Sequence, residues 1–404
     1  MSLFITQIEQ QLSNLAESYT QQGSDLKAVI HHWAHAIAAG STPIGEPPTL
    51  EIIKTLQNAQ LYTNKDEFRH KLYSEIVFPP PSAPKFHFID LFAGIGGFRL
   101  ALQEANGACV FSSEWDRSAQ QTYFNNYGEL PFGDIRAFTN DNISDELLNK
   151  LIPTHEILAG GFPCQPFSHA GVSARSAVGK QHGFECKTQG TLFFDIMRIA
   201  SVKRPKVLLL ENVRNIQSHD QGRTFNVIKS EVEELGYDFK FKIIDASTLV
   251  PQRRLRCYMV CLRKDLNVNF EFPDFTGNSL PLRTILEENP PSDFTISDRL
   301  WQGHINRTQR NLERGTGFTA FTADIDKPSN TLVARYGKDG KECLIPQEGK
   351  NPRLLTPREC ARLQGYPDKF VIPKAKTPAY KQFGNSIAVP VVSKIVNKLI
   401  MDLI

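Results

Sequence analysis

The sequence lacks long hydrophobic runs and a regular set of cysteines. No apolar stretch approaches the roughly 20 residues that a membrane-spanning helix needs, and the N-terminal MSLFITQIEQQLSNLAESY mixes polar residues with apolar ones. The seven cysteines are odd in number and scattered, which favours free thiols in a reducing compartment over a disulfide framework. We therefore expect a cytoplasmic protein with no membrane segment.

A metal-binding pattern is lacking as well. The only close pair of cysteines, Cys257 and Cys261, lies in the apolar run CYMVC. Residues four apart on a strand point to the same face, so we expect both to be small buried side chains rather than ligands. The sequence predicts no metal site.

The net charge is small, at +3, but the charges are unevenly distributed. Between Arg299 and Arg353 there are ten Lys and Arg residues against six Asp and Glu residues, which makes this segment more positive than the whole chain. Such an excess is expected of a surface that faces phosphates, although an ordinary solvated face would look similar.

The 404 residues divide into three segments by pattern. Helical periodicity extends to about residue 78, and Pro79, Pro80 and Pro81 then interrupt it. From Phe86 onward, apolar runs such as HFIDLF, EILAGGF and KVLLLENV alternate with helical stretches, which is typical of an α/β, doubly wound, mostly parallel sheet. The expected domains are a helical extension with a Pro-rich linker (1–84), an α/β domain (85–265 and 372–404) and a small irregular domain (266–371).

A glycine-rich turn follows the first predicted strand. In FIDLFAGIGGFRLAL, Gly94, Gly96 and Gly97 lie between strand and helix, where a bare backbone lets a cofactor approach closely. The last glycine of a full dinucleotide fingerprint is missing. After the next strand, the carboxylate of Glu114 could accept ribose hydroxyls and the indole of Trp115 could stack on adenine. The alternative is an exposed acid beside a half-buried core tryptophan.

The segment GGFPCQPFS from Gly160 to Ser168 is the most informative. A cysteine between Pro163 and Pro166, after an apolar strand, is held on a rigid non-helical turn and is presented rather than packed. These residues resemble the PCQ motif of the C5 cytosine-specific DNA methyltransferase family. The other blocks of that family follow in order: GTLFFDIMRI from Gly190, LENV from Leu210, QRRLR from Gln252, RLLTPRECARLQGYP from Arg353 and QFGNSIAVPV from Gln382.

The resemblance implies a Rossmann-like fold, S-adenosylmethionine as cofactor with S-adenosylhomocysteine as product, and a covalent mechanism. Cys164 would attack carbon 6 of cytosine, so that carbon 5 can accept the methyl group. Glu211 would bind or protonate N3, which requires a raised pKa, and Asn212 would hold the loop. Arg256 would contact O2 and Arg254 would support the nucleophile loop and a phosphate.

Strand alternation would place Gln252, Arg254 and Arg256 on one face. The cofactor residues expected from the turn and the resemblance are Phe92, Gly94, Gly96, Gly97, Glu114, Trp115, Asp134, Pro163, Leu192, Asn385 and Ser386. The expected DNA-binding residues are Gln165, Ser168, Gln252, Arg335 and Lys338.

The implied partner is double-stranded DNA, from which the target base is flipped. Residues 169–189 are expected to form a mobile loop that closes over DNA. Part of the basic segment resembles the recognition region of the bacterial subgroup that methylates CC-containing sites such as CCGG and CCWGG. The protein would act as a monomer without an obligate protein partner, in the bacterial cytoplasm at the nucleoid, within a restriction-modification system or as an orphan enzyme.

Three alternatives remain at this point. A tRNA cytosine methyltransferase shares the PCQ and ENV blocks, but a Cys-Phe-Thr signature is absent from this sequence. A catalytically inactive DNA-binding homologue would not need intact Cys164 and Glu211. For residues 1–84, regulatory DNA binding is known for extensions in the family, whereas a plain helical cap is the interpretation we favour.

Overall fold

The computed structural model describes residues 3–163, 192–315 and 322–403. Two compact units are present: the first comprises residues 1–243, 256–271 and 399–404, and the second comprises residues 244–255 and 272–398. These units divide the chain differently from the predicted segments, because residues 1–84 belong to the same unit as the sheet and residues 372–398 belong to the other. The predicted domain bounds themselves stay a prediction.

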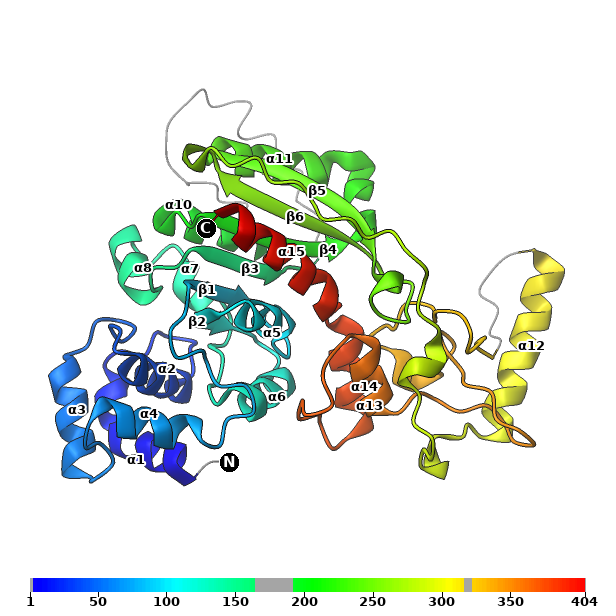
Figure 1. The fold of residues 1–404 in the computed structure, drawn as a ribbon, viewed down its shortest axis with the longest axis horizontal. Coiled ribbons are helices and arrows are strands. Elements are labelled where there is room, and N and C mark those ends of the chain that lie inside the picture. Colours follow the sequence, from blue (N-terminus) through cyan, green and yellow to red (C-terminus); the bar gives the residue numbers. More distant parts are fainter. Residues whose placement is uncertain (1–2, 164–191, 316–321, 404) are drawn as a thin grey trace. The chain divides into compact units, whose positions relative to one another are not determined.

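The helices and strands alternate as the sequence predicts (Figure 1). The first unit contains α1 (Leu3–Glu17), α2 (Leu26–Ala39), α3 (Thr49–Asn58), α4 (Lys65–Tyr73), β1 (Phe86–Leu91), α5 (Gly97–Glu104), β2 (Gly107–Ser113), α6 (Arg117–Tyr127), α7 (Arg136–Thr139), α8 (Asp145–Leu151), β3 (Ile157–Gly161), α10 (Leu192–Lys203), β4 (Val207–Val213), α11 (Arg223–Glu234) and most of β5 (Tyr237–Asp245) and β6 (Leu255–Arg263). The second unit contains α12 (Asp298–Arg314), α13 (Pro357–Leu363), α14 (Lys376–Asn385) and most of α15 (Val389–Leu403).

Six strands form one sheet in the order β2-β1-β3-β4-β6-β5. The pairs β1–β2, β1–β3 and β3–β4 are parallel, whereas β6 is antiparallel to β4. Strands β1, β3 and β4 are buried along almost their whole length, as expected of central strands covered on both faces. The prediction of an α/β fold with a mostly parallel sheet is confirmed. Cys257 and Cys261 on β6 are fully buried free thiols, as predicted.

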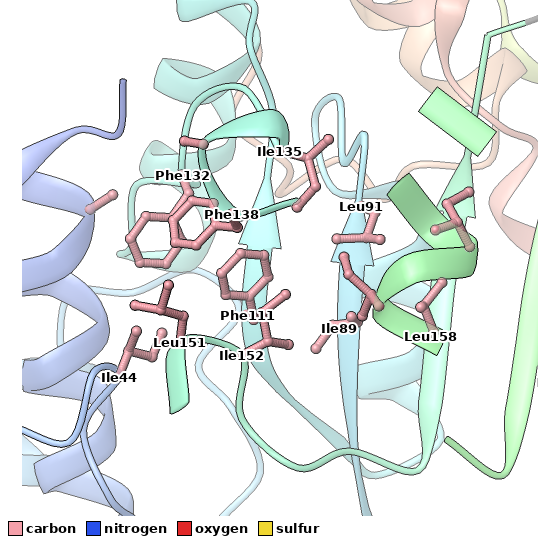
Figure 2. Close-up of a cluster of buried hydrophobic side chains, with 14 of the residues drawn as sticks. Ile44, Ile89, Leu91, Phe111, Phe132, Ile135, Phe138, Leu151, Ile152 and Leu158 are labelled. Carbon is pink, nitrogen blue, oxygen red and sulfur yellow. The ribbon is translucent and has the colours of Figure 1, made fainter. Parts of the chain in front are cut away.

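The N-terminal helices share one hydrophobic core with the sheet. Helix α2 begins after Asp25, whose side chain accepts the Lys27 N–H, and ends at Gly40 in the left-handed conformation. Trp33 is fully buried, and its indole N–H donates to the Ile44 carbonyl. Figure 2 shows Ile44 in the same apolar cluster as rings that come from β2 and the segments after it. The extension therefore packs onto the sheet and is not an independent domain.

The second unit contains buried polar side chains with well-defined partners as well as buried apolar ones. A capping box joins Thr356 and Glu359 at the start of α13, and the buried Glu359 carboxylate also pairs with Arg353 at 2.7 Å. The hydroxyl of the buried Tyr336 donates to the Cys343 carbonyl at 2.6 Å. This irregular structure matches the weak periodicity of the sequence. Within the described residues, no helix combines the length and the apolarity that crossing a membrane requires.

Candidate active site

The glycine-rich turn after β1 has a special backbone conformation. Phe92, with φ 55°, adopts a left-handed conformation that is costly for a side chain of this size, and Gly94 and Gly96 also have positive φ. A Cβ at Gly94 would meet open space, whereas one at Gly96 would lie 2.3 Å from the Tyr127 ring. The missing side chain of Gly96 therefore lets the Tyr127 ring pack closely against the turn. The missing side chain of Gly94 leaves space in which a ligand could approach the backbone.

Glu114 follows β2 and is tied to the same turn. One of its carboxylate oxygens accepts the Gly94 N–H at 2.8 Å and the other accepts the Asp116 N–H at 2.7 Å. Burial raises the pKa of Glu114, although these N–H groups oppose the rise. The neighbouring Trp115 is 77% exposed, so the alternative of a half-buried core tryptophan is not what the structure contains. An exposed indole beside a buried carboxylate fits a nucleoside.

Asp134 lies between β2 and β3, beyond α6. Its carboxylate receives the Nε–H of Arg136 at 2.9 to 3.0 Å, and this hydrogen bond lowers the pKa of Asp134. The carboxylate is about one-third exposed. Asp134 is therefore an ionised acceptor, as contact with an adenine amino group requires.

Strands β3, β4 and β6 bring a second set of polar groups together. Glu211, near the end of β4, is opposite Gly161 of β3, and its carboxylate lies 3.1 Å from the Nε of Arg256 on β6. A Cβ at Gly161 would lie 3.5 Å from Oε2 of Glu211, so the glycine leaves room for the carboxylate. Both side chains are mostly buried, which strengthens their electrostatic interaction.

Asn212 holds the chain directly after β3, whereas its predicted role in holding the nucleophile loop stays a prediction. Its side-chain N–H donates to the Phe162 carbonyl at 2.9 Å, and its oxygen accepts the Val213 N–H at 2.8 Å. The chain then reaches the exposed Pro163. Cys164, Gln165, Ser168 and the expected loop 169–189 lie outside the described residues, and Leu192 is the first residue of α10.

The predicted strand alternation of QRRLR is wrong. Strand β6 begins only at Leu255, so Gln252 and Arg254 precede it and belong to the second unit. The buried Gln252 amide donates to the Leu363 carbonyl and accepts the Leu332 N–H. Arg254 is also buried, and its guanidinium donates to the carbonyls of Leu332 and Gly384. Within the second unit both side chains bridge segments distant in sequence, and Arg256 alone lies on the strand.

Of the remaining predicted residues, Gly97 is the first residue of α5 in the first unit, and the other four lie in the second unit. Asn385 ends α14 and is exposed, and the Ser386 hydroxyl lies 2.8 Å from that of Tyr366. Arg335 and Lys338 are exposed at a short 3-10 turn. Their assignments to cofactor and DNA stay predictions.

Sequence reasoning missed two residues that shape the glycine-rich turn. The Tyr127 hydroxyl donates to the Gly96 carbonyl at 2.6 Å, and the side-chain amide of Gln120 donates to the Glu114 carbonyl. Both lie on α6, where their spacing from each other shows only that they share a helix. Their partners are in other elements, so no local pattern in the sequence marks them.

Comparisons with known proteins agree with this arrangement. A family model described as C-5 cytosine-specific DNA methylase matches residues 86–401. The chain is 47% identical over 332 residues to the Type II methyltransferase M.SsoII of Shigella sonnei, covering 81% of this chain and 83% of that protein. It is 39% identical over 388 residues to a DNA-cytosine methyltransferase of Escherichia coli K12, covering 83% and 82%.

Solved structures show the same fold at lower identity. The S. pombe Dnmt2 methyltransferase matches with a TM-score of 0.59 and 18% identity, covering 79% of this chain and 99% of that one. The Entamoeba histolytica methyltransferase EhMeth matches with a TM-score of 0.58 and 19% identity, covering 80% and 100%.

Proposed function

The chain belongs to the C-5 cytosine-specific DNA methylase family and methylates carbon 5 of cytosine in DNA, and we propose that S-adenosylmethionine is the methyl donor and leaves as S-adenosylhomocysteine. When bound, this cofactor supplies an electrophilic methyl group on a sulfonium sulfur. The open backbone at Gly94, the carboxylate of Glu114 and the exposed indole of Trp115 support this proposal. The other residues proposed to hold the cofactor are Phe92, Gly96, Gly97, Asp134, Pro163, Leu192, Asn385 and Ser386.

Cys164 is the proposed nucleophile. Carbon 5 of cytosine is a poor nucleophile, so the thiolate first adds to carbon 6 and the displaced electron pair makes carbon 5 an enamine carbon. After carbon 5 has gained the methyl group, it loses its proton, and elimination of the thiolate restores the ring. The hydrogen bond from Asn212 to the Phe162 carbonyl supports this role, because it anchors the chain two residues before the thiol.

The pair of Glu211 and Arg256 carries the proposal. A carboxyl group and a guanidinium 3.1 Å apart, both mostly buried, at the end of β4 and the start of β6, match the N3 and O2 positions of a cytosine ring. We propose that the base takes over the guanidinium contact through O2, which frees Glu211 to share a proton with N3.

On the DNA side, we propose that the cytosine is flipped out of a specific duplex sequence that contains CC. Gln165 and Ser168 beside the nucleophile would contact the DNA, and Arg335 and Lys338 would contact base edges or phosphates. We do not propose Gln252 as a DNA-binding residue, because its buried amide already has two backbone partners. Arg254 is still proposed to support the nucleophile loop and a phosphate, and within the second unit its guanidinium donates to the carbonyls of Leu332 and Gly384.

The proposed setting is the bacterial cytoplasm, with the enzyme a monomer in a restriction-modification system or an orphan. The experiment is methylation of a plasmid by the purified protein with S-adenosylmethionine, followed by base-resolution mapping of 5-methylcytosine. We expect one CC-containing sequence to be modified by the wild type and none by Cys164→Ser. Methylation by Cys164→Ser, or methylation of tRNA but not of the plasmid, would contradict the proposal.

A further inference from the structure

We propose that the N-terminal helices position the cofactor-binding turn, with His31 and His35 of α2 holding the segment 127–132 and this segment holding Gly96 and Glu114. The inference rests on the proposed cofactor site and adds a role for residues 1–84. All the residues involved lie in the first unit, where α2 packs against β2.

His31 makes the first contact with the segment. Its Nδ1 accepts the backbone N–H of Leu130 at 3.0 Å, and its Nε2 lies 2.8 Å from Oε1 of Glu9. Because Nδ1 accepts a hydrogen bond, the ring is the neutral tautomer that donates from Nε2. Glu9 is fixed from its other side by Lys27 at 2.9 Å. Two helices of the extension therefore orient one ring toward the backbone of Leu130.

His35, one turn further along α2, makes the second contact. Its Nε2 donates to the Gly128 carbonyl at 3.2 Å. Gly128 ends α6 with φ 70°, and a Cβ there would lie 2.3 Å from the Ile76 side chain. Ile76, in the linker after α4, therefore packs closely against the residue that His35 holds, and a side chain at position 128 would require Ile76 to shift.

The segment in turn holds both parts of the cofactor site. The Tyr127 hydroxyl donates to the Gly96 carbonyl at 2.6 Å, immediately before α5. At its other end, the Phe132 carbonyl accepts the Glu114 N–H at 2.8 Å, and the Phe132 N–H donates to the Ser112 carbonyl at 2.9 Å. Four residues separate these two contacts along the chain, so a shift of the segment moves the turn and the carboxylate together.

A buried ion pair ties the segment to α5 as well. Arg99 donates to the Glu129 carboxylate, and its guanidinium lies over the Tyr127 ring at 4.7 Å. Burial alone would raise the pKa of Glu129, but Arg99, with His32 and His35 nearby, lowers it to about 2. The ionised pair is fully enclosed, and removal of one partner from such a pair is strongly destabilising.

These contacts give the extension a function that a solvent-facing cap would not have. A turn that is already ordered loses less conformational freedom when the cofactor binds, and the affinity is higher for that reason. Each hydrogen bond from α2 contributes on the order of 1 kcal/mol, or about 5-fold in affinity if it acts wholly through the turn.

The test uses two pairs of variants in the full chain. His31→Asn keeps an acceptor near the position of Nδ1, whereas His31→Gln moves the amide to the position of Nε2 and loses the bond to Leu130. His35→Gln keeps the donor near Nε2, whereas His35→Asn withdraws it from Gly128. We expect His31→Gln and His35→Asn each to weaken S-adenosylhomocysteine binding about 5-fold by calorimetry, while His31→Asn and His35→Gln retain most of the affinity.

A cofactor-free readout accompanies the calorimetry. Hydrogen exchange of the backbone amides of residues 92–98 is expected to be faster in His31→Gln and His35→Asn. Trp33→Phe is the matched control, because it removes the bond to the Ile44 carbonyl inside the extension without touching the segment. It should lower thermal stability while leaving both readouts at wild-type values.

Unchanged affinity and exchange in the folded His31→Gln and His35→Asn variants would overturn the inference, as would equal weakening by Trp33→Phe. If His31→Gln does not fold, the comparison of His35→Asn with His35→Gln tests the inference alone. Failure of the wild type to bind S-adenosylhomocysteine would instead reject the proposed function. The two failures are therefore distinguishable.

Discussion

The contact between Glu211 and Arg256 depends on the pairing of two strands in the sheet. Their strands are neighbours in antiparallel register, so the ends of β4 and β6 bring a carboxylate and a guanidinium within 3.1 Å. The sequence predicts both residues, because the ENV and QRRLR blocks are contiguous. It did not predict their pairing, because 45 positions separate them and the contact exists only once the sheet has formed.

The first prediction concerns Glu211→Gln. An amide cannot protonate N3, so we expect the methylation rate constant to fall by about 10²- to 10⁴-fold while S-adenosylhomocysteine still binds. Single-turnover kinetics with labelled cofactor measures the change, and Glu231→Gln on α11 serves as a second buried carboxylate of the same unit. A rate within a few-fold of the wild type would contradict the role given to Glu211.

The second prediction concerns Glu114→Ala. This change removes a carboxylate that accepts the N–H groups of Gly94 and Asp116, and hydrogen bonds to a charged group contribute about 1.5 to 3 kcal/mol. We expect cofactor affinity to fall by at least about 10-fold, while the affinity for DNA stays the same. Calorimetry that finds the wild-type dissociation constant for S-adenosylhomocysteine would exclude this role.

At the scale of elements, the loop after α6 connects the extension to the cofactor turn. The positions of β1, β3 and β4 were predictable, because each of these strands is largely a short apolar run between polar segments. The start of β6 was not, because four of the five residues of QRRLR are polar and tertiary hydrogen bonds of Gln252 and Arg254 keep those two residues out of the strand. The role of the loop was equally hidden, since its partners on α2 lie 93 and 99 positions away.

The third prediction compares two glycines that end helices with similar φ values. Gly128 ends α6 and contacts Ile76, whereas Gly315 ends α12 with open space around its missing Cβ. Gly315→Ala should cost about 1 kcal/mol from backbone strain alone. Gly128→Ala should cost about 1 to 3 kcal/mol more, because the methyl group overlaps a packed side chain. Urea unfolding of both variants measures the difference, and equal losses would show that the contact with Ile76 is unimportant.

At the scale of the whole chain, buried histidines make stability depend on pH. His32 on α2 stacks on Phe132 at 4.5 Å, and burial lowers its pKa to about 4. Glu129 opposes this shift, whereas His35, Arg99 and His31 add to it. Burial also lowers the pKa of His155, in the first unit, to about 4.

A helical extension was predictable from periodicity, but its burial against the sheet was not.

The fourth prediction follows from the sign of these shifts. Below pH 6.5 the unfolded chain binds a proton at His32 that the folded chain rejects, so stability is complete above that pH and falls toward pH 4. Between pH 7.5 and 5.5 the His32 share is about 1.4 kcal/mol. His32→Phe should reduce the pH-dependent loss by this amount in urea unfolding, and His70→Phe, at an exposed position of α4, should not. Identical pH profiles of wild type and His32→Phe would refute the prediction.

The central claim is that the thiol of Cys164 bonds to carbon 6 of the target cytosine. Replacing that cytosine by 5-fluorocytosine, in a duplex that carries the mapped site, blocks loss of the group on carbon 5 and hence release of the enzyme. With S-adenosylmethionine present, we predict a stable protein–DNA adduct by mass spectrometry, located on the peptide that contains Cys164 and absent from Cys164→Ser. Absence of an adduct with the wild-type protein, or an adduct on another residue, would contradict the account.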